Sequence, residues 1–474
     1  MKCAILILMT MLALTACAVG PNFKPPRSPA TDRYTAAEPP LSLASGADVP
    51  YEWWRIYGSP ALDALVAQAL HGSPTVSAAQ AALRQANELV KVQRASLFPG
   101  LQASYSPMRE RDAVGTLAPT LSSAQPLFTL QTAQVSVSYL LDVFGGTRRQ
   151  IESAQAQADN QRYELEAAYL TLTSNVVTAA IQEASLRAQI KANEDIVRGE
   201  RDGLDILNRQ VTLGGIAQTA VLAQQAALAA AQAQLPPLRK QLAMQRDLLA
   251  VLVGRSPGEP VPQTFELSAL TLPKDLPLSL PAALIRQRPD VLAAEAQLHY
   301  ATAQVGVAIA DLLPQINLTA TLGGTSTSLS TLLASGNTFW SAGANLSQTL
   351  FAGGALWHHK LAADAALDQA GAQYRTVVLG ALQNVADTLY ALQFDAQAVE
   401  ANQAAEQAAR NSLQATHATL TQGSITYLDL LNAEQAQAQA ISNLEQARAN
   451  HLADTAALFV ALGGGWWNRP DHMR

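Results

Sequence analysis

Charged and aromatic residues are scarce in this sequence. Of its 474 residues, 14% are Asp, Glu, Lys or Arg and 5% are Phe, Trp or Tyr. Aromatic side chains dominate burial in ordinary globular enzymes, so the composition does not favour that class. The formal net charge is −6, and basic residues form no extended run. Because phosphate binding requires clustered Lys and Arg side chains, nucleic acid is excluded as the main partner.

Cysteine is almost absent, with two in the whole chain. Cys3 lies in an N-terminal apolar stretch that is too short to cross a bilayer as a stable helix. This stretch ends in Leu14-Thr15-Ala16 directly before Cys17, the pattern of a lipoprotein signal peptide. We predict that residues 1–16 are removed and that Cys17 is acylated, which leaves no possible disulfide framework. The alternative is an ordinary secretory signal with an incidental cysteine.

Recognisable motifs of catalysis or metal binding are also missing. The sequence has no Cys-x-x-Cys, Gly-x-Ser-x-Gly, His-Glu-x-x-His or phosphate-binding loop. Adjacent residues of a helix cannot face one metal ion, so His358-His359 is interpreted as a polar helix start rather than a metal or pH site. Arg148-Arg149 is likewise interpreted as a solvated helix start rather than a site for lipid headgroups. We predict no enzyme and no cofactor besides the covalent lipid on Cys17.

What the sequence does contain is an internal duplication. Pro74-Thr75-Val76 matches Pro289-Asp290-Val291 at an offset of 215 residues. Gly145-Gly146 matches Gly353-Gly354 at an offset of 208 residues. Such a nearly constant spacing over a long stretch predicts two copies of one structural unit.

Each copy is predicted to contain two strands. Apolar and polar residues alternate in four runs, which begin near Leu101, Ala133, Ile316 and Trp340. A period of two over about ten residues is typical of tilted strands in a bilayer. The alternative is the edge or hairpin of a soluble sandwich.

A long helical pattern follows the second strand of each copy. Over residues 147–211, apolar and small residues recur in steps of three and four, which predicts a coiled-coil seam. About 65 helical residues would form a rod of about 100 Å. Gly214-Gly215 is expected to reverse the chain, and Gly423 to do so after the second long helix, over about 355–420. Pro236-Pro237 is expected to bend the first returning helix.

Four strands cannot close a barrel by themselves. An open sheet edge in hydrocarbon leaves backbone N–H and C=O groups unpaired, and each unpaired group costs several kcal/mol. Two chains would supply eight strands, whose interior is filled by side chains, whereas three would supply twelve around a water-filled interior. The residues alone therefore predict an oligomer without fixing its number of subunits.

The sequence resembles the TolC-type outer-membrane efflux proteins, and most closely their lipoprotein subgroup. The likeness covers essentially the whole mature chain, and although each motif alone is weak, their order is specific. The motifs are Cys17-Ala18-Val19-Gly20-Pro21, Trp53-Trp54, Arg288-Pro289-Asp290-Val291, Leu313-Pro314, Tyr427-Leu428-Asp429-Leu430-Leu431-Asn432-Ala433 and Ala461-Leu462-Gly463-Gly464-Gly465-Trp466. Ser59 and Ser73 stand where the family often has Asp and Asn, and both are expected to cap helices or turns.

The resemblance implies a mostly α fold with membrane β-strands. It implies a homotrimer that forms a 12-stranded β-barrel and a 12-helix α-barrel, anchored by lipid in the cell outer membrane with a periplasmic extension. Its function would be a passive conduit for small molecules or drugs in a tripartite efflux system. The partners would be a periplasmic adaptor and an inner-membrane transporter, commonly of the resistance-nodulation-division type. The alternatives are the outer-membrane duct of a type I protein secretion system and a lipid-anchored coiled-coil scaffold without a pore.

The resemblance also assigns the tunnel tip, and with it the adaptor contact, to the two turns between long helices. The assigned residues are Leu213, Gly214, Gly215, Ile216, Leu420, Gly423, Ser424 and Ile425. Relatives often constrict the tip with acidic residues, but residues 210–219 and 419–428 contain no Asp or Glu. Our hypothesis is that closure here is mainly apolar and steric. The exported substrate does not follow from the sequence.

The predicted organisation has six parts. These are a signal peptide (1–16), a lipidated N-terminal segment with a short helix (17–73), the first repeat (74–258), a linker with a short helix (259–288), the second repeat (289–465) and a C-terminal tail (466–474).

Overall fold

The computed structural model describes most of the chain. The described residues are 18–27, 33–36, 43–111, 127–272, 276–279, 281–421 and 424–470. Two residues with predicted roles, Cys17 and Gly423, lie outside these ranges. Within them, no helix combines the length and the apolar character that crossing a bilayer would require.

The chain forms two units. Unit 1 consists of Met1–Pro26, Ala82–Gln161 and Ala294–Tyr374, and unit 2 of Arg27–Ala81, Arg162–Ala293 and Arg375–Arg474. Each unit therefore takes residues from both predicted repeats. Unit 1 contains an antiparallel sheet, and unit 2 contains two helical hairpins together with the segments that connect them.

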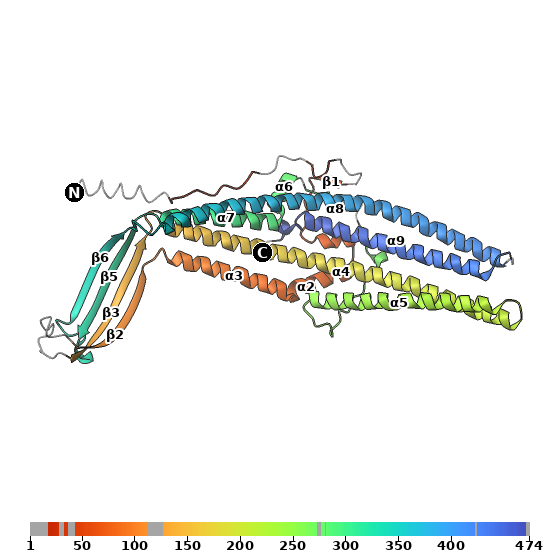
Figure 1. Cartoon of the computed structure of the whole chain (residues 1–474), viewed down its shortest axis with the longest axis horizontal. Coiled ribbons are helices and arrows are strands. Elements are labelled where there is room, and N and C mark those ends of the chain that lie inside the picture. The colour runs from red at the N-terminus through yellow and green to blue at the C-terminus, as the bar shows by residue number, and fades with distance from the viewer. Residues whose placement is uncertain are drawn as a thin grey trace. The chain divides into compact units, whose positions relative to one another are not determined.

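The four alternating runs of the sequence form one antiparallel sheet in unit 1 (Figure 1). Its strands are β2 (Gly100–Arg111), β3 (Leu127–Leu141), β5 (Gln315–Ser326) and β6 (Thr338–Ser347), in the spatial order β2-β3-β5-β6. The central pairing joins β3 to β5, with Val135 opposite Leu322. The two copies of the duplicated unit thus meet in the middle of the sheet, which the sequence had not predicted.

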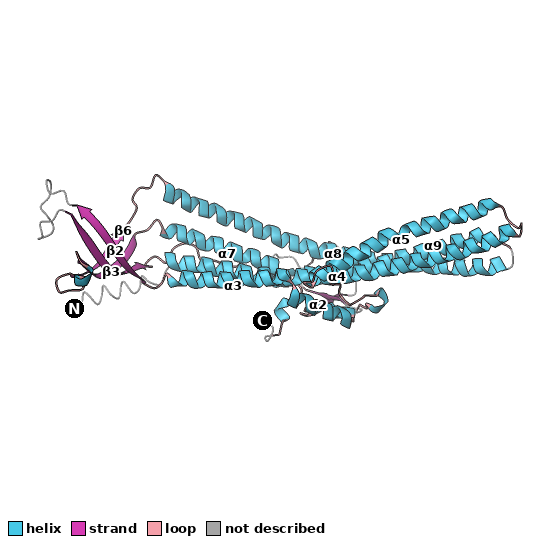
Figure 2. Ribbon diagram, turned by 90° about the horizontal axis from the view of Figure 1, so that it is seen from below, coloured by secondary structure: helices cyan, strands magenta, loops and turns pink. Residues whose placement is uncertain are grey.

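Most other described secondary structure is helical, as Figure 2 shows in cyan. The helices are α2 (Pro60–Gly72), α3 (Pro74–Ala95), α4 (Gly146–Thr212), α5 (Gln218–Leu252), α6 (Pro281–Gln287), α7 (Pro289–Ala310), α8 (Ala355–Thr421) and α9 (Tyr427–Ala461). Helices α3, α4 and α5 have 22, 67 and 35 residues, and α7, α8 and α9 have the same lengths in the same order. The repeated sequence pattern therefore produces repeated elements.

In unit 2 the long helices pair as antiparallel hairpins, α4 with α5 and α8 with α9 (Figure 1). The predicted seam of α4 packs against α5, where Ile190 and Val197 form a buried cluster with Ala231 and Leu235. Helix α5 continues through Pro236-Pro237, directly after that cluster.

A core of aromatic and aliphatic side chains joins the N-terminal part of unit 2 to α9. Trp53, in the short helix η1 (Trp53–Tyr57), stacks on Phe459 with ring centroids 5.5 Å apart. Tyr57 is fully buried and donates a hydrogen bond of 2.8 Å to the carbonyl of Leu452. Full burial of a large apolar side chain stabilises a fold by about 1.5–3 kcal/mol. The Trp53-Trp54 motif thus anchors a segment from before the first repeat.

The starts of the helices show why polar residues occupy particular positions. Ser59 is the N-cap of α2 and accepts a hydrogen bond of 3.4 Å from the N–H of Leu62, as expected. Ser73 is the C-cap residue of α2. At the start of α7, Arg288 forms an ion pair of 2.7 Å with Asp290 and donates to the carbonyl of Ala461 at 2.9 Å.

Two elements of unit 2 had no counterpart in the sequence interpretation. Strands β1 (Leu43–Ser45) and β4 (Leu276–Leu278) form a short parallel pair. Each has three residues, too few for an alternating pattern to be visible in the sequence. Their pairing depends on contact between distant segments.

Both repeats end on a glycine that no other residue can replace without strain. Gly254 has a φ of +79°, and a Cβ at this position would lie 2.1 Å from the carbonyl oxygen of Gly72, at the end of α2. Gly463 has a φ of +93°, and its Cβ would lie 2.9 Å from the carbonyl oxygen of Gln287, at the end of α6. The backbone that leaves α5 or α9 therefore passes directly against the end of a shorter helix.

We expect Gly254→Ala to lower the free energy of unfolding by about 2–4 kcal/mol, because it adds both a positive-φ penalty and a steric clash. The midpoint of thermal loss of helical circular dichroism in detergent measures this effect. Gly258→Ala is the matched control, since its Cβ would meet only the Ser256 hydroxyl at 3.9 Å. Equal midpoints for the two variants would show that the backbone adapts without cost.

Candidate functional site

Over its central rows the sheet of unit 1 has one apolar face and one uncharged polar face, whereas the end of β2 adds Arg109 and Arg111 to the first face and Glu110 to the second. Residues opposite each other on neighbouring strands share a face. The register places Ala103, Val135, Leu322 and Trp340 in one row across all four strands. The adjacent row, on the other face, is Gln102, Ser136, Thr321 and Ser341. Further rows extend the apolar face to Leu101, Tyr105, Val137, Leu318 and Leu346.

The apolar face is open to its surroundings in a single chain. Trp340 is 76% exposed and Leu322 is 64% exposed. Strands β2 and β6 end the sheet, and among the described strands each of them pairs with one neighbour only. One chain thus leaves an apolar surface uncovered and two rows of backbone groups without a strand partner, which a sheet in hydrocarbon does not tolerate.

The turns assigned to the tunnel tip connect α4 to α5 and α8 to α9, both in unit 2. In the first turn, Gly214 has a φ of +76° and Leu213 is 86% exposed, while Ile216 is half-buried. In the second turn, Ser424 is exposed, and Leu420 and Ile425 are half-buried. The assigned residues therefore form two small turns with few polar side chains, and Gly423 lies outside the described residues.

The Asp429 carboxylate, next to the second turn, accepts two hydrogen bonds from Thr426. Asp429, in the first turn of α9, accepts hydrogen bonds of 2.8 Å from the N–H and 2.6 Å from the hydroxyl of Thr426. These bonds lower the pKa of the Asp429 carboxyl. Thr426 and Asp429 form a capping box, and the spacing Thr426-x-x-Asp429 is its signature in the sequence, although it was not among the predicted features.

Close to the turns, the two hairpins contact each other through a half-buried acidic side chain. Glu434 of α9 lies against Gly199 of α4, where an added Cβ would be 2.7 Å from a carboxylate oxygen. His417 of α8 lies 4.0 Å from the same carboxylate. Burial raises the pKa of Glu434. The neighbouring Glu200 is 1% exposed and accepts a hydrogen bond of 2.6 Å from Gln224 of α5.

A second acidic contact joins α8 to α9 further along the same hairpin. Burial, followed by the neighbouring Asp454 carboxylate, raises the pKa of Asp395 to about 6. His451 lies one turn before Asp454 on α9, and burial lowers its pKa. The helix pair therefore carries a carboxyl group that changes its charge at mildly acidic pH.

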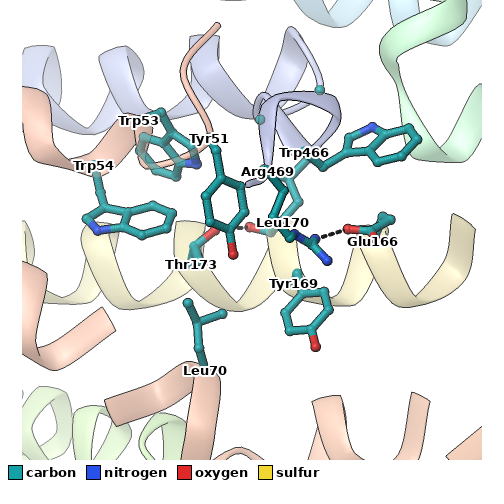
Figure 3. A pocket seen from close by; sticks show the side chains of 12 residues that line it. Tyr51, Trp53, Trp54, Leu70, Glu166, Tyr169, Leu170, Thr173, Trp466 and Arg469 are labelled. Carbon is teal, nitrogen blue, oxygen red and sulfur yellow. Dashed lines mark hydrogen bonds and ion pairs between the residues drawn. The ribbon is translucent and has the colours of Figure 1, made fainter. Parts of the chain in front are cut away.

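The C-terminal residues of unit 2 are fixed to α4 by a buried ion pair. Figure 3 shows the Arg469 guanidinium between the rings of Tyr51 and Tyr169, directed at Glu166. Its central carbon lies 5.2 Å and 4.9 Å from the two ring centroids. Burial raises the pKa of Glu166, and Arg469 opposes that effect. Trp466 adds a hydrogen bond of 2.7 Å to the carbonyl of Gln287. We interpret this small pocket as a structural joint.

The arginine pair after β3 corrects one prediction. Arg148 forms an ion pair of 3.0 Å with Asp142, and the side chain of Arg149 is 4% exposed. The interpretation of both residues as a solvated helix start was therefore wrong for Arg149. The N-terminal segment of the chain covers it, and such a non-local contact leaves no local pattern in the sequence. His358 and His359 lie exposed in the first turn of α8.

Comparison with known proteins identifies the family of the chain. The family model described as outer membrane efflux protein matches residues 65–255 and 280–464. The chain belongs to the outer membrane efflux protein family. It is an outer-membrane channel component of a tripartite efflux system, as the sequence predicted, and members of this family work with adaptor and inner-membrane pump partners.

The relatives agree over nearly the full length. The pyoverdine export outer membrane protein OpmQ of Pseudomonas putida is 30% identical over 87% of this chain and 88% of its own. The cation efflux system protein CusC of Escherichia coli is 24% identical over 98% of this chain and 99% of its own. The solved structure of the outer-membrane channel OprN superposes with a TM-score of 0.85 at 28% identity, covering 95% of this chain and all of that one. These relatives are channels, not enzymes.

The raised pKa of Asp395 gives a pH dependence to the stability of the channel. The folded state binds an extra proton between the ordinary value of 3.8 and about 6, so this contribution favours folding below about pH 4 and is lost as the pH rises through 6. Asp395→Asn is uncharged at every pH, and its amide can donate to Asp454. We expect this variant to melt a few degrees above the wild type at pH 7.5 and to lose that difference at pH 4.

Melting temperatures in detergent across pH 4–8 measure this dependence. Asp387→Asn, which removes an exposed carboxylate from the same helix, is the control and should follow the wild type. A wild-type advantage at pH 7.5 would contradict the assignment.

Proposed function

We propose that three copies of this chain combine their sheets into one closed 12-stranded barrel and their long helices into a 12-helix tunnel, through which small molecules leave the cell. The two-faced sheet with open edges carries this proposal. Joining β2 of one copy to β6 of the next would give every edge a partner. The apolar face would then meet lipid and the polar face would line the pore.

The lining of such a pore selects little. Its central rows of Ser, Thr, Gln and Asn are uncharged, so they neither attract nor repel ions strongly, and Glu110 lies on the same face near the end of β2. The names of the relatives fit this view, because one exports pyoverdine and another belongs to a cation efflux system. We therefore place substrate choice in the inner-membrane transporter, which we propose to be of the resistance-nodulation-division type.

The conduit is proposed to be passive. The sequence contains no phosphate-binding loop, so the free energy for export would come from the transporter through a periplasmic adaptor. The adaptor is proposed to contact the two turns at Leu213, Gly214, Gly215 and Ile216 and at Leu420, Gly423, Ser424 and Ile425. We further propose acylation of Cys17, which would add a lipid anchor to the barrel.

Export should depend completely on the inner-membrane partner. Cells that lack the inner-membrane transporter that works with this chain should retain a fluorescent efflux dye to the same extent as cells that lack the chain itself. Dye efflux rate after washing is the measurement, with each gene restored on a plasmid as control. Undiminished export without any transporter would contradict a passive conduit.

Closure at the turns should be apolar. Single-channel conductance of the purified protein in planar bilayers should rise severalfold in the double variant Leu420→Ser with Ile425→Ser, because hydroxyls permit wetting of the constriction. Leu222→Ser, which changes an exposed leucine on α5, should leave the conductance unchanged. The closed wild-type channel should also be insensitive to millimolar divalent cations. Block by these ions would instead indicate a ring of carboxylates.

A further inference from the structure

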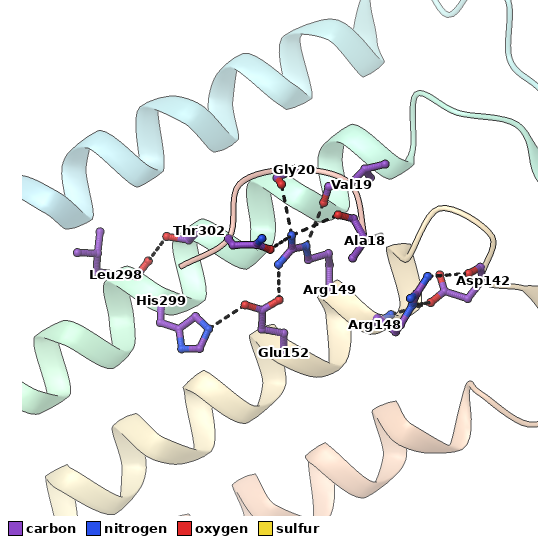
Figure 4. A network of polar contacts seen from close by, with 11 residues as sticks. Ala18, Val19, Gly20, Asp142, Arg148, Arg149, Glu152, Leu298, His299 and Thr302 are labelled. Atoms are coloured by element: carbon purple, nitrogen blue, oxygen red, sulfur yellow. Dashed lines mark hydrogen bonds and ion pairs between the residues drawn. The ribbon is translucent and has the colours of Figure 1, made fainter. Parts of the chain in front are cut away.

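A buried arginine in unit 1 binds the backbone of the N-terminal segment. The Arg149 guanidinium donates hydrogen bonds to the carbonyl oxygens of Val19 at 3.0 Å, Gly20 at 3.3 Å and Ala18 at 3.5 Å (Figure 4). It also donates to the side-chain oxygen of Asn22 at 2.7 Å. Three consecutive carbonyl groups thus converge on one planar cation, which offers five N–H donors in a fixed arrangement.

The surface around this arginine is shaped for a main chain. The N–H of Val19 donates to the carbonyl of Phe144 at 3.0 Å, directly after β3. A Cβ on Gly145 would lie 2.6 Å from the Cα of Ala18, and a Cβ on Gly20 would lie 2.5 Å from the Cα of Gly306. Glycines on both sides therefore allow the segment to lie directly on the start of α4 and on α7.

The other end of the segment is bound by an aromatic and ionic contact. Phe23 stacks on His299 of α7 with ring centroids 4.3 Å apart and an interplanar angle of 15°. Glu152 accepts hydrogen bonds of 2.6 Å from Arg149 and 2.9 Å from His299, so it links the two contacts. Burial alone would raise the pKa of Glu152, but these hydrogen bonds outweigh it and lower the pKa.

We propose that Arg149, Glu152, His299 and the notch formed by Gly145 and Gly306 are a docking site for residues 18–23, which fixes the lipid anchor beside the junction of β3 and α4. The lipid part rests on the proposed acylation of Cys17, the residue directly before Ala18. Arg149 is a positioning residue in this view. It holds the acylated end where a strand leaves the sheet, so that anchor and sheet enter the membrane at the same place.

Mobility of the segment in the intact, membrane-inserted protein tests the docking site. Lys24 is exposed, and no other cysteine remains in the mature chain once Cys17 is acylated, so a nitroxide on Lys24→Cys reports on this segment alone. The spin label should be immobile in the wild-type background. It should also be immobile in the control Arg148→Ala, because the Arg148 guanidinium pairs with Asp142 and not with the N-terminal segment. Arg149→Ala should give a mobile spectrum. Arg149→Lys should resemble it, because an ammonium cannot serve all four acceptors.

Gly20→Ala tests the same docking site if Arg149→Ala does not fold. Gly20→Ala alters only the bound segment, at a φ of +88°, and should release it while leaving the helices unchanged. An immobile label in a folded Arg149→Ala or Gly20→Ala variant would overturn the docking site.

Incorporation of radiolabelled palmitate separates this proposal from the acylation on which it rests. The wild type, Arg149→Ala and Gly20→Ala should all incorporate palmitate equally, and Cys17→Ser should incorporate none. Labelling that persists in Cys17→Ser would refute the anchor. The spectra from Lys24→Cys, compared in a background with both Cys3→Ser and Cys17→Ser, would still decide whether residues 18–23 dock, because Cys3 stays in the chain when the signal peptide is not removed.

Discussion

The backbone hydrogen bonds of two edge strands constrain this protein more than any other feature. β2 and β6 each lack a partner on one side within the described sheet, and the apolar side chains beside them identify the surrounding medium as hydrocarbon. Water cannot satisfy those groups there, so in the proposed assembly another chain would do so. The alternation of residues along each strand would then determine which face meets lipid and which lines the pore. The proposed oligomer, barrel and polar lining would all follow from this one requirement.

The duplication supplies both halves of the sheet and both helical hairpins. Because β3 pairs with β5, the two copies meet within the sheet, and the helices that follow have equal lengths in both copies. Gly254 and Gly463, at the ends of the two hairpins, each allow the backbone to pass close to the end of a shorter helix. Each compact unit nevertheless contains residues of both copies. The repeat is thus a unit of sequence and of element order, whereas packing combines corresponding elements of the two copies.

Charged groups in the helical part are few, and most of those that are buried have a defined partner. Arg288 and Arg469 join distant segments, while Arg149 holds the N-terminal segment through its carbonyl groups. The acidic residues Glu434 and Asp395 lie where helices of the hairpins meet, with raised pKa values. The stability of the hairpin packing therefore depends on the protonation of these two groups.

Much of this architecture could be predicted from the residues in order. Alternation with a period of two predicted the four strands, spacings of three and four predicted the long helices, and Gly214-Gly215 predicted the first turn, because these patterns reflect local geometry. The family followed from the order of short motifs. The cap at Ser59 was foreseen, but the capping box of Thr426 and Asp429 was overlooked although its spacing is visible.

Other features depend on contacts between residues that are far apart in the sequence. Nothing local to Arg149 indicates that residues 18–23 cover it, and nothing local to β3 indicates that its partner is β5. The same holds for Glu434 against Gly199. By itself, the sequence determined the elements and their repetition, because periodicity is a property of short segments. Only the tertiary structure decided which buried charges meet and where the N-terminal segment lies, because those contacts arise from the packing of distant elements.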